Sequence, residues 1–280
     1  MKKGISVILA VLLAVSCLTG LSGCGSSKKT TLYVYNWGQY ISEGDDGSLD
    51  VIAAFEEAYP NIRVQYSTYD SNEIMYSKLS NGGITVDVII PSDYMIGRMV
   101  QEGMLEELNF SNIPNYQYID DSFKNTSYDP ENKYSVPYTW GTVGIIYNTK
   151  YVDEADVTGW ELLWNEKYAG KILMFDNSRD AFGTAMYMLG LDVNSTDKGV
   201  WQQAYDQLLS QRPLVYSYVM DEIFNMMESG EAAVGAYYAG DYFTMRDAQA
   251  EHVDLQFYYP QRSNFYIDAM CIPSCAQNKE

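Results

Sequence analysis

The feature that most constrains the fold is an alternation of short apolar runs with amphipathic segments over residues 31–103. The apolar runs have the length of buried strands, and the segments between them carry apolar residues at helical spacing. Strands are expected at residues 31–40, 62–66 and 86–90, and helices at residues 49–58, 72–79 and 93–101. This alternation predicts an α/β fold with a mostly parallel sheet flanked by helices.

A second strand–helix pattern follows a looser region that ends near residue 134. Residues 134–148 are expected to be extended, as a strand pair or as one long strand. Further strands are expected at residues 171–175, 232–238, 253–259 and 265–272, helices at residues 179–189, 201–209 and 221–227, and the start of another helix at residues 275–280. This length of chain predicts two lobes or one large domain.

The N-terminus has the pattern of a secreted lipoprotein. A short basic start precedes an apolar run at residues 5–15, which is too short to span a membrane. Residues 21–24, Leu-Ser-Gly-Cys, resemble the bacterial lipobox. We expect a signal peptide at residues 1–23, lipidation of Cys24 and a flexible tether at residues 24–30, which would hold the protein on the extracytoplasmic face of the cell membrane. A plain signal peptide with a chance cysteine is the alternative.

The charge balance favours a cationic partner. Without residues 1–23 the chain carries 16 Lys and Arg against 37 Asp and Glu, a net charge of −21. Nucleic acid is disfavoured as a partner because phosphates require a basic surface. The 26 tyrosines and five tryptophans are suited to cation–π contacts. The alternative is that the negative charge serves only solubility.

Aromatic side chains gather at the end of the first expected strand. Trp37 and Tyr40 lie at its C-terminal end, which is where open α/β sheets bind ligands. A purely structural role for Trp37 in the core is the alternative. The position therefore marks a candidate binding surface without naming its ligand.

Other chemistry-bearing residues favour neither catalysis nor metal binding. Cys271 and Cys275 are expected as two small buried thiols or one disulfide, because a metal site would need further ligands and His252 lies near neither. Ser92 lacks the flanking glycines of a nucleophile elbow and a neighbouring histidine. We expect no catalytic residue, no metal and no cofactor.

Six short segments together resemble the bacterial spermidine/putrescine-binding proteins, the extracytoplasmic receptors of polyamine ABC transporters. They are residues 35–40, 66–73, 91–94, 134–141, 176–180 and 265–268. The resemblance implies a two-lobed periplasmic-binding-protein-like fold with the ligand cleft between the lobes. The first lobe would comprise residues 31–140 and 268–280, and the second residues 141–267. Relatives continue beyond residue 280, so the chain is expected to lack the C-terminal part of the fold.

The resemblance also implies which aromatic and hydroxyl side chains bind the ligand. The first lobe supplies Trp37 and Tyr40 as a wall, with Ser92 and Tyr94 on the neighbouring loop. Tyr238 and Tyr266 occupy positions where the best-known members have tryptophan. Gly38 differs from the hydroxyl residue that is usual in the family.

Three acids complete the implied site. Asp180 would meet one ammonium group and Asp268 another. A family acid aligns with Asn177, so Asp176 would replace it only after a shift of the loop. Asp176 and Asp180 could instead only cap the helix that follows. Asp268 interrupts an apolar strand and needs a partner if buried.

These features predict a monomeric receptor that captures spermidine or putrescine and presents it to the membrane permease of an ABC importer. Closure would occur at chain crossings near Trp140 and Tyr266. A receptor of the same architecture for another cationic or polar solute is the alternative. A more remote one is a secreted hydrolase that uses paired carboxylates.

Overall fold

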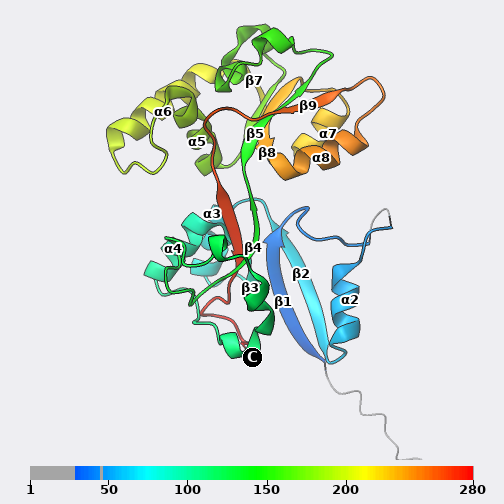
Figure 1. Cartoon of the computed structure of the whole chain (residues 1–280), viewed down its shortest axis with the longest axis vertical. Helices are drawn as coiled ribbons and strands as arrows, with labels where there is room; N and C mark the ends of the chain where they lie inside the picture. The colour runs from blue at the N-terminus through cyan, green and yellow to red at the C-terminus, as the bar shows by residue number, and fades with distance from the viewer. Residues whose placement is uncertain (1–28, 45–46, 280) are drawn as a thin grey trace, which may run out of the picture. The chain divides into compact units, whose positions relative to one another are not determined.

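The computed structural model describes residues 29–44 and 47–279 (Figure 1). The predicted signal peptide, Cys24 and residues 24–28 of the predicted tether lie outside the described residues. The described chain forms two compact units, a smaller one of residues 29–31 and 43–64 and a larger one of residues 32–42 and 65–279. None of the described helices is long and apolar enough to cross a membrane.

The smaller unit is built around helix α2 (Val51–Ala58). Asp50 caps this helix by accepting a hydrogen bond from the Ala53 N–H at 2.8 Å. The helix ends at Tyr59, whose N–H still bonds to the Phe55 carbonyl, because Pro60 follows and cannot continue it. The cap and the proline explain why the predicted bounds are close to those observed.

The larger unit contains most of a three-stranded sheet with the order β2-β1-β3. Its strands are β1 (Thr30–Trp37), β2 (Ile62–Tyr69) and β3 (Val88–Ile89), and β1 and β3 are parallel. Helices α3 (Asn72–Ser80) and α4 (Asp93–Gln101) follow β2 and β3, and Ser71 caps α3 through the Ile74 N–H. Tyr35, Met75, Ile89 and Met99 belong to the core of this region.

The buried carboxylate of Asp87 ties the last described residues to this sheet. It accepts hydrogen bonds from the backbone N–H groups of Tyr33, Gln277 and Asn278. Residues 275–279 consequently follow an irregular path, and the helix predicted to start at residue 275 is not formed. Cys271 is buried and Cys275 is exposed, and both are free thiols rather than a disulfide.

The larger unit also contains a five-stranded sheet with the order β7-β6-β8-β5-β9. Its strands are β5 (Val143–Asn148), β6 (Ile172–Phe175), β7 (Val215–Val219), β8 (Val234–Tyr238) and β9 (Leu255–Tyr258). β6 is parallel to β7 and β8, whereas β5 is antiparallel to β8 and β9. The sheet is therefore mixed rather than mostly parallel as predicted. The reversal of β5 places its first residue at the edge where the parallel strands end.

Four helices accompany this sheet, and short 3₁₀ segments occur in the described part of the chain. The helices are α5 (Ser178–Leu189), α6 (Lys198–Gln211), α7 (Glu222–Glu228) and α8 (Ala239–Ala248). The 3₁₀ segments are η2 (Phe110–Asn112), η3 (Pro114–Tyr118), η4 (Asp121–Phe123), η5 (Glu154–Asp156), η6 (Trp160–Trp164) and η7 (Glu166–Tyr168). Every residue of β5 and β6 is buried, which makes these strands the centre of the core.

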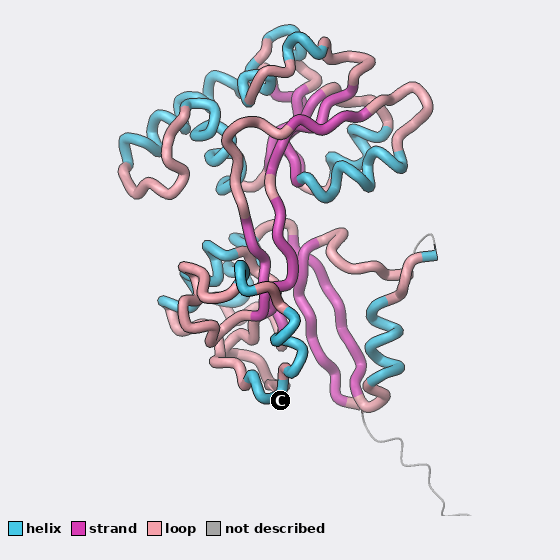
Figure 2. The backbone as a smooth tube through the Cα atoms, viewed as in Figure 1, coloured by secondary structure: helices cyan, strands magenta, loops and turns pink. Residues whose placement is uncertain are grey.

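An antiparallel pair, β4 (Val136–Gly141) and β10 (Tyr266–Met270), adjoins both sheets (Figure 2). β4 leads into β5 through Thr142 alone, so residues 134–148 form two strands in different sheets. Cys271, the residue after β10, forms a bridge with Ile89 of β3 in the first sheet. The lobe limits predicted from the sequence stay a prediction.

Candidate functional site

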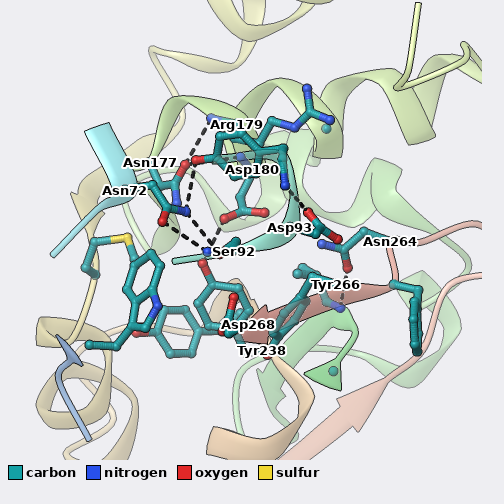
Figure 3. Close-up of a pocket in the computed structure, with 18 of the residues that line it drawn as sticks. Asn72, Ser92, Asp93, Asn177, Arg179, Asp180, Tyr238, Asn264, Tyr266 and Asp268 are labelled. Carbon is teal, nitrogen blue, oxygen red and sulfur yellow. Dashed lines mark hydrogen bonds between the residues drawn. The ribbon is translucent and has the colours of Figure 1, made fainter. Parts of the chain in front are cut away.

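A cavity of about 710 Å³ lies within the larger unit. Its walls come from the loops that follow β1 and β3, from β4 and β10, and from the segments that follow β6, β7 and β8 (Figure 3). Eight of the nine predicted binding residues line it: Trp37, Tyr40, Ser92, Tyr94, Asp180, Tyr238, Tyr266 and Asp268. The ninth, Asp176, is exposed and does not line the cavity.

The first aromatic wall is held in place by backbone hydrogen bonds. The indole N–H of Trp37 donates to the Ile90 carbonyl at 2.9 Å, and its ring lies 4.7 Å from that of Tyr69. The Tyr138 hydroxyl donates to the backbone carbonyl of Tyr40 at 2.7 Å. The first bond orients the Trp37 ring, and the second holds the backbone at Tyr40.

Asp268 is the most deeply buried acid of the cavity. Its side chain is only 2% exposed, and the hydroxyl of Tyr40 donates to Oδ2. The other oxygen, Oδ1, has no hydrogen-bond partner among residues 29–44 and 47–279. Burial raises the pKa of Asp268 to about 7, although the neighbouring Ser92 and Tyr40 oppose the shift. A buried carboxylate oxygen with no partner in the described chain can accept a hydrogen bond from a ligand.

Asp180 projects from the first turn of α5 and accepts a hydrogen bond from the Tyr238 hydroxyl at 2.7 Å. Burial raises the pKa of Asp180 to about 6, while the bond from Tyr238 and the charge of Arg179 oppose the shift. Asn177 caps the helix by accepting hydrogen bonds from the N–H groups of Arg179 and Asp180. The cap is therefore supplied by Asn177, not by Asp176 or Asp180.

The second aromatic wall is formed by Tyr238 and Tyr266, whose ring centroids lie 5.5 Å apart in an edge-on arrangement. Burial and the charge of Asp268 raise the pKa of Tyr266, which keeps its hydroxyl protonated. The Tyr266 ring occupies the space that a side chain at position 141 would need, so Gly141 is required there.

A polar network fixes the loop that follows β3. The amide nitrogen of Asn72 donates to the Ser92 hydroxyl at 3.0 Å and to the Tyr94 hydroxyl at 3.1 Å. The Asn72 carbonyl accepts the Ser92 N–H at 3.2 Å, and the Tyr94 hydroxyl donates to Glu73 at 2.9 Å. Ser92 and Tyr94 are thus held by partners within the chain.

Sequence reasoning missed several charged residues of the cavity. Asp93, Asp221, Asp241 and Arg179 also line it. Burial raises the pKa of Asp241 to about 7, and the charge of Asp221 adds to the shift. Asp241 follows a predicted strand by three residues, and Asp221 starts a predicted helix. Acids directly after strands were the signal that could have identified them.

The charge of the lining suits an organic cation. Six aspartates line the cavity, Asp70, Asp93, Asp180, Asp221, Asp241 and Asp268, against one arginine and no lysine. Within the described chain, no group of three or more His, Cys, Asp or Glu side chains is arranged to hold a metal ion. Aromatic faces beside separated carboxylates are suited to ammonium groups on an apolar chain.

The sequence also matches known proteins. Residues 50–280 match the family of bacterial extracellular solute-binding proteins. The chain belongs to this family. The spermidine/putrescine-binding periplasmic protein of Salmonella typhimurium is 34% identical over 96% of this chain and 75% of its own length. The resemblance inferred from six short segments is therefore confirmed.

Solved structures of solute-binding proteins agree with the fold. A structure named for a spermidine/putrescine ABC transporter of Listeria monocytogenes has 38% identity and a TM-score of 0.81, and covers 89% of this chain and 74% of its own. A lipoprotein of Treponema pallidum has 32% identity and a TM-score of 0.76 over 89% and 76% of the two chains. The predicted periplasmic-binding-protein-like α/β fold is confirmed.

Proposed function

We propose that this solute-binding protein captures a polyamine, spermidine or putrescine, in the cavity and delivers it to an ABC importer. The observation that carries the proposal is the buried Oδ1 of Asp268, which lacks a partner in the described chain, on a residue that lines a cavity with aromatic walls. A primary ammonium group supplies the missing donor and the compensating charge. The names of the relatives support the same class of ligand.

The expected affinity requires both carboxylates and aromatic rings. A hydrogen bond to a charged group contributes roughly 1.5–3 kcal/mol. A buried methylene adds about 0.8 kcal/mol, and a cation over an aromatic ring about 0.5–2 kcal/mol. Micromolar binding needs about 8 kcal/mol after the entropic cost of association. Neither kind of contact suffices alone.

The proposed contacts follow the cavity walls. Asp268 and Asp180 each receive an ammonium group, and Asp241 is a further anion within the same cavity. Trp37, Tyr40, Tyr238 and Tyr266 cover the methylene chain, and Ser92 and Tyr94 position the loop beside it. Asp176 is left out because its exposed side chain does not reach the cavity.

We further propose how the protein works in the cell. Lipidation of Cys24 holds a monomer at the extracytoplasmic face of the membrane, and the ligand-bound form is presented to the permease. Ligand binding favours a closed form because both aromatic walls contact the same ligand. The bound polyamine is released unchanged, as expected of a transport receptor rather than an enzyme.

Calorimetric titration with spermidine and putrescine tests the proposal. The wild-type protein should bind at least one amine at micromolar concentration, and Asp268→Asn should lose most of that affinity. Asp176→Asn is the matched control, since it removes the same charge from an exposed position and should bind like wild type. Absence of binding near 100 μM, about −5.5 kcal/mol, or equal binding by Asp268→Asn contradicts the proposal. Mass spectrometry of the recovered amine should show no chemical change.

A further inference from the structure

The cavity contains a single cationic side chain, and its position is unusual. Among the described residues that line the cavity, Arg179 alone carries a positive charge. It lies in the first turn of α5, immediately after the capping residue Asn177 and Ser178. The positive end of the helix dipole disfavours a cation there. Helix stability therefore does not account for this residue.

The surroundings of Arg179 place its charge beyond Asp180. Its guanidinium carbon lies 5.1 Å from the ring centroid of Tyr94. Burial raises the pKa of Asp93, Asp180 and Tyr187, and the charge of Arg179 opposes the rise in each. Figure 3 shows Arg179 and Asp180 near each other at the top of the view and Asp268 lower in it, and the Tyr238 hydroxyl donates to Asp180.

The guanidinium is not neutralised by a direct ion pair. No salt bridge of Arg179 is found within the described part of the chain, although Asp93 and Asp180 lie close enough to feel its charge. Its side chain is half-buried against Tyr94 rather than extended into solvent. A ligand nitrogen that passed beyond Asp180 would meet this charge directly.

We propose that Arg179 ends the cationic binding site on the Asp180 side and thereby limits how many ammonium groups a bound polyamine can carry. This inference rests on the proposed function and adds a residue that determines specificity. Asp180 accepts the terminal ammonium, and Arg179 repels any further one. The remaining charges of the ligand then point toward Asp268 and Asp241.

A charge series at position 179 tests this inference. Spermine serves as the probe with one more ammonium group than spermidine, and N8-butylspermidine, here called N-butylspermidine, has a methyl group in place of that ammonium. Relative to spermidine, Arg179→Gln should improve spermine binding about tenfold, which is about 1.4 kcal/mol, and Arg179→Glu should improve it further. The affinity for N-butylspermidine relative to spermidine should change less than threefold in these variants. Arg179→Lys, which keeps the positive charge, should have the same relative affinities as wild type.

Two controls separate local repulsion from other effects. Arg98→Gln removes the same charge from α4 outside the cavity. It should leave the affinities for spermine and N-butylspermidine, relative to spermidine, unchanged. If Arg179→Gln does not fold, wild-type protein alone still decides, because repulsion predicts about tenfold tighter binding of N-butylspermidine than of spermine. Equal rejection of both ligands would indicate a steric wall and overturn the inference. The inference would also be overturned if a folded Arg179→Gln protein binds spermidine but has the same affinity for spermine relative to spermidine as wild type. Failure of wild type to bind spermidine or putrescine would instead contradict the proposed function.

Discussion

The two ends of the cavity hold their acids in opposite ways. Asp268 belongs to a strand, is 2% exposed and has one oxygen without a partner in the described chain. Asp180 lies in a helix start, receives the Tyr238 hydroxyl and has Arg179 beside it. The first acid is incomplete without a ligand, whereas the second is already partly satisfied. Ligand binding should therefore depend more strongly on Asp268.

Asp268→Asn should produce the largest effect. We expect a loss of about a hundredfold in polyamine affinity at pH 8, because a charged hydrogen bond at a buried site lies at the upper end of about 1.5–3 kcal/mol. The folded protein should persist, since asparagine has nearly the same shape. Calorimetry measures the loss, and thermal unfolding confirms the fold. If Asp268→Asn loses less affinity than Asp180→Asn, binding depends more on Asp180 than on Asp268, which contradicts the comparison.

The pH dependence of binding should be the next largest effect. With pKa values of about 7 for Asp268 and about 6 for Asp180, lowering the pH from 8 to 6 should weaken binding about tenfold through Asp268 and about twofold through Asp180. Stability of the empty protein should change in the opposite direction. The pKa of Asp268 is raised on folding, so its protonation stabilises the empty protein below the unfolded pKa, and this stabilisation is lost as the pH rises through about 7.

Titrations and thermal unfolding across this pH range would measure both effects. Asp268→Asn should remove most of the dependence, and Asp180→Asn should remove little. If both substitutions reduce the pH dependence equally, the two acids do not differ in the way that their surroundings indicate.

Asp180→Asn should lower affinity by about tenfold at pH 8, near the lower end of the range for charged hydrogen bonds. The Tyr238 hydroxyl can still donate to the amide oxygen, so the local packing is retained. Calorimetry with the same amine gives the value. The neighbouring Asp176→Asn protein is the control, because it shares the chain segment but not the cavity. Equal losses in the two variants would exclude a direct role for Asp180.

Tyr238→Phe should have the smallest effect, a change of about two- to fivefold in affinity for either amine. The substitution keeps the aromatic wall and removes only the hydrogen bond to Asp180. Loss of that bond should raise the pKa of Asp180 above about 6, so the effect should grow at lower pH. A pH-independent change would mean that the hydroxyl acts on the ligand rather than on the acid.

Short-range patterns in the sequence predicted much of the fold. Helix α4 is predicted at residues 93–101 and observed at Asp93–Gln101, because its buried residues recur at helical spacing and Gly103, with a positive φ, follows its end. β7 and α8 were missed: β7 has a polar, half-exposed face, and α8 begins with Ala239 and Gly240 directly after a strand. The antiparallel direction of β5 depends on distant strands, which no local pattern encodes.

Sequence patterns identified residues that line the cavity best where aromatic and acidic residues lie within recognisable segments. The proximity of Tyr40 to Asp268, 228 positions later, could not be derived from spacing. Asp176 was a plausible acid by sequence but is exposed, because Asn177 rather than Asp176 caps the helix. Asp241 and Arg179 were missed because their importance depends on which side chains face the same cavity.

The chain crosses between the two sheets at two neighbouring points. Thr142 alone joins β4 to β5, and beside it Asn264 accepts the Val143 N–H at 2.8 Å while the Ser263 hydroxyl donates to the Val143 carbonyl. Because the two crossings are bonded to each other, rotation of one sheet against the other would have to occur in both together. A few degrees of backbone rotation there, spread over two dihedral angles per residue, would be amplified with distance into a larger displacement at the cavity edge. Opening would then require little loss of packing, and its rate would be set by local dihedral barriers rather than by unfolding.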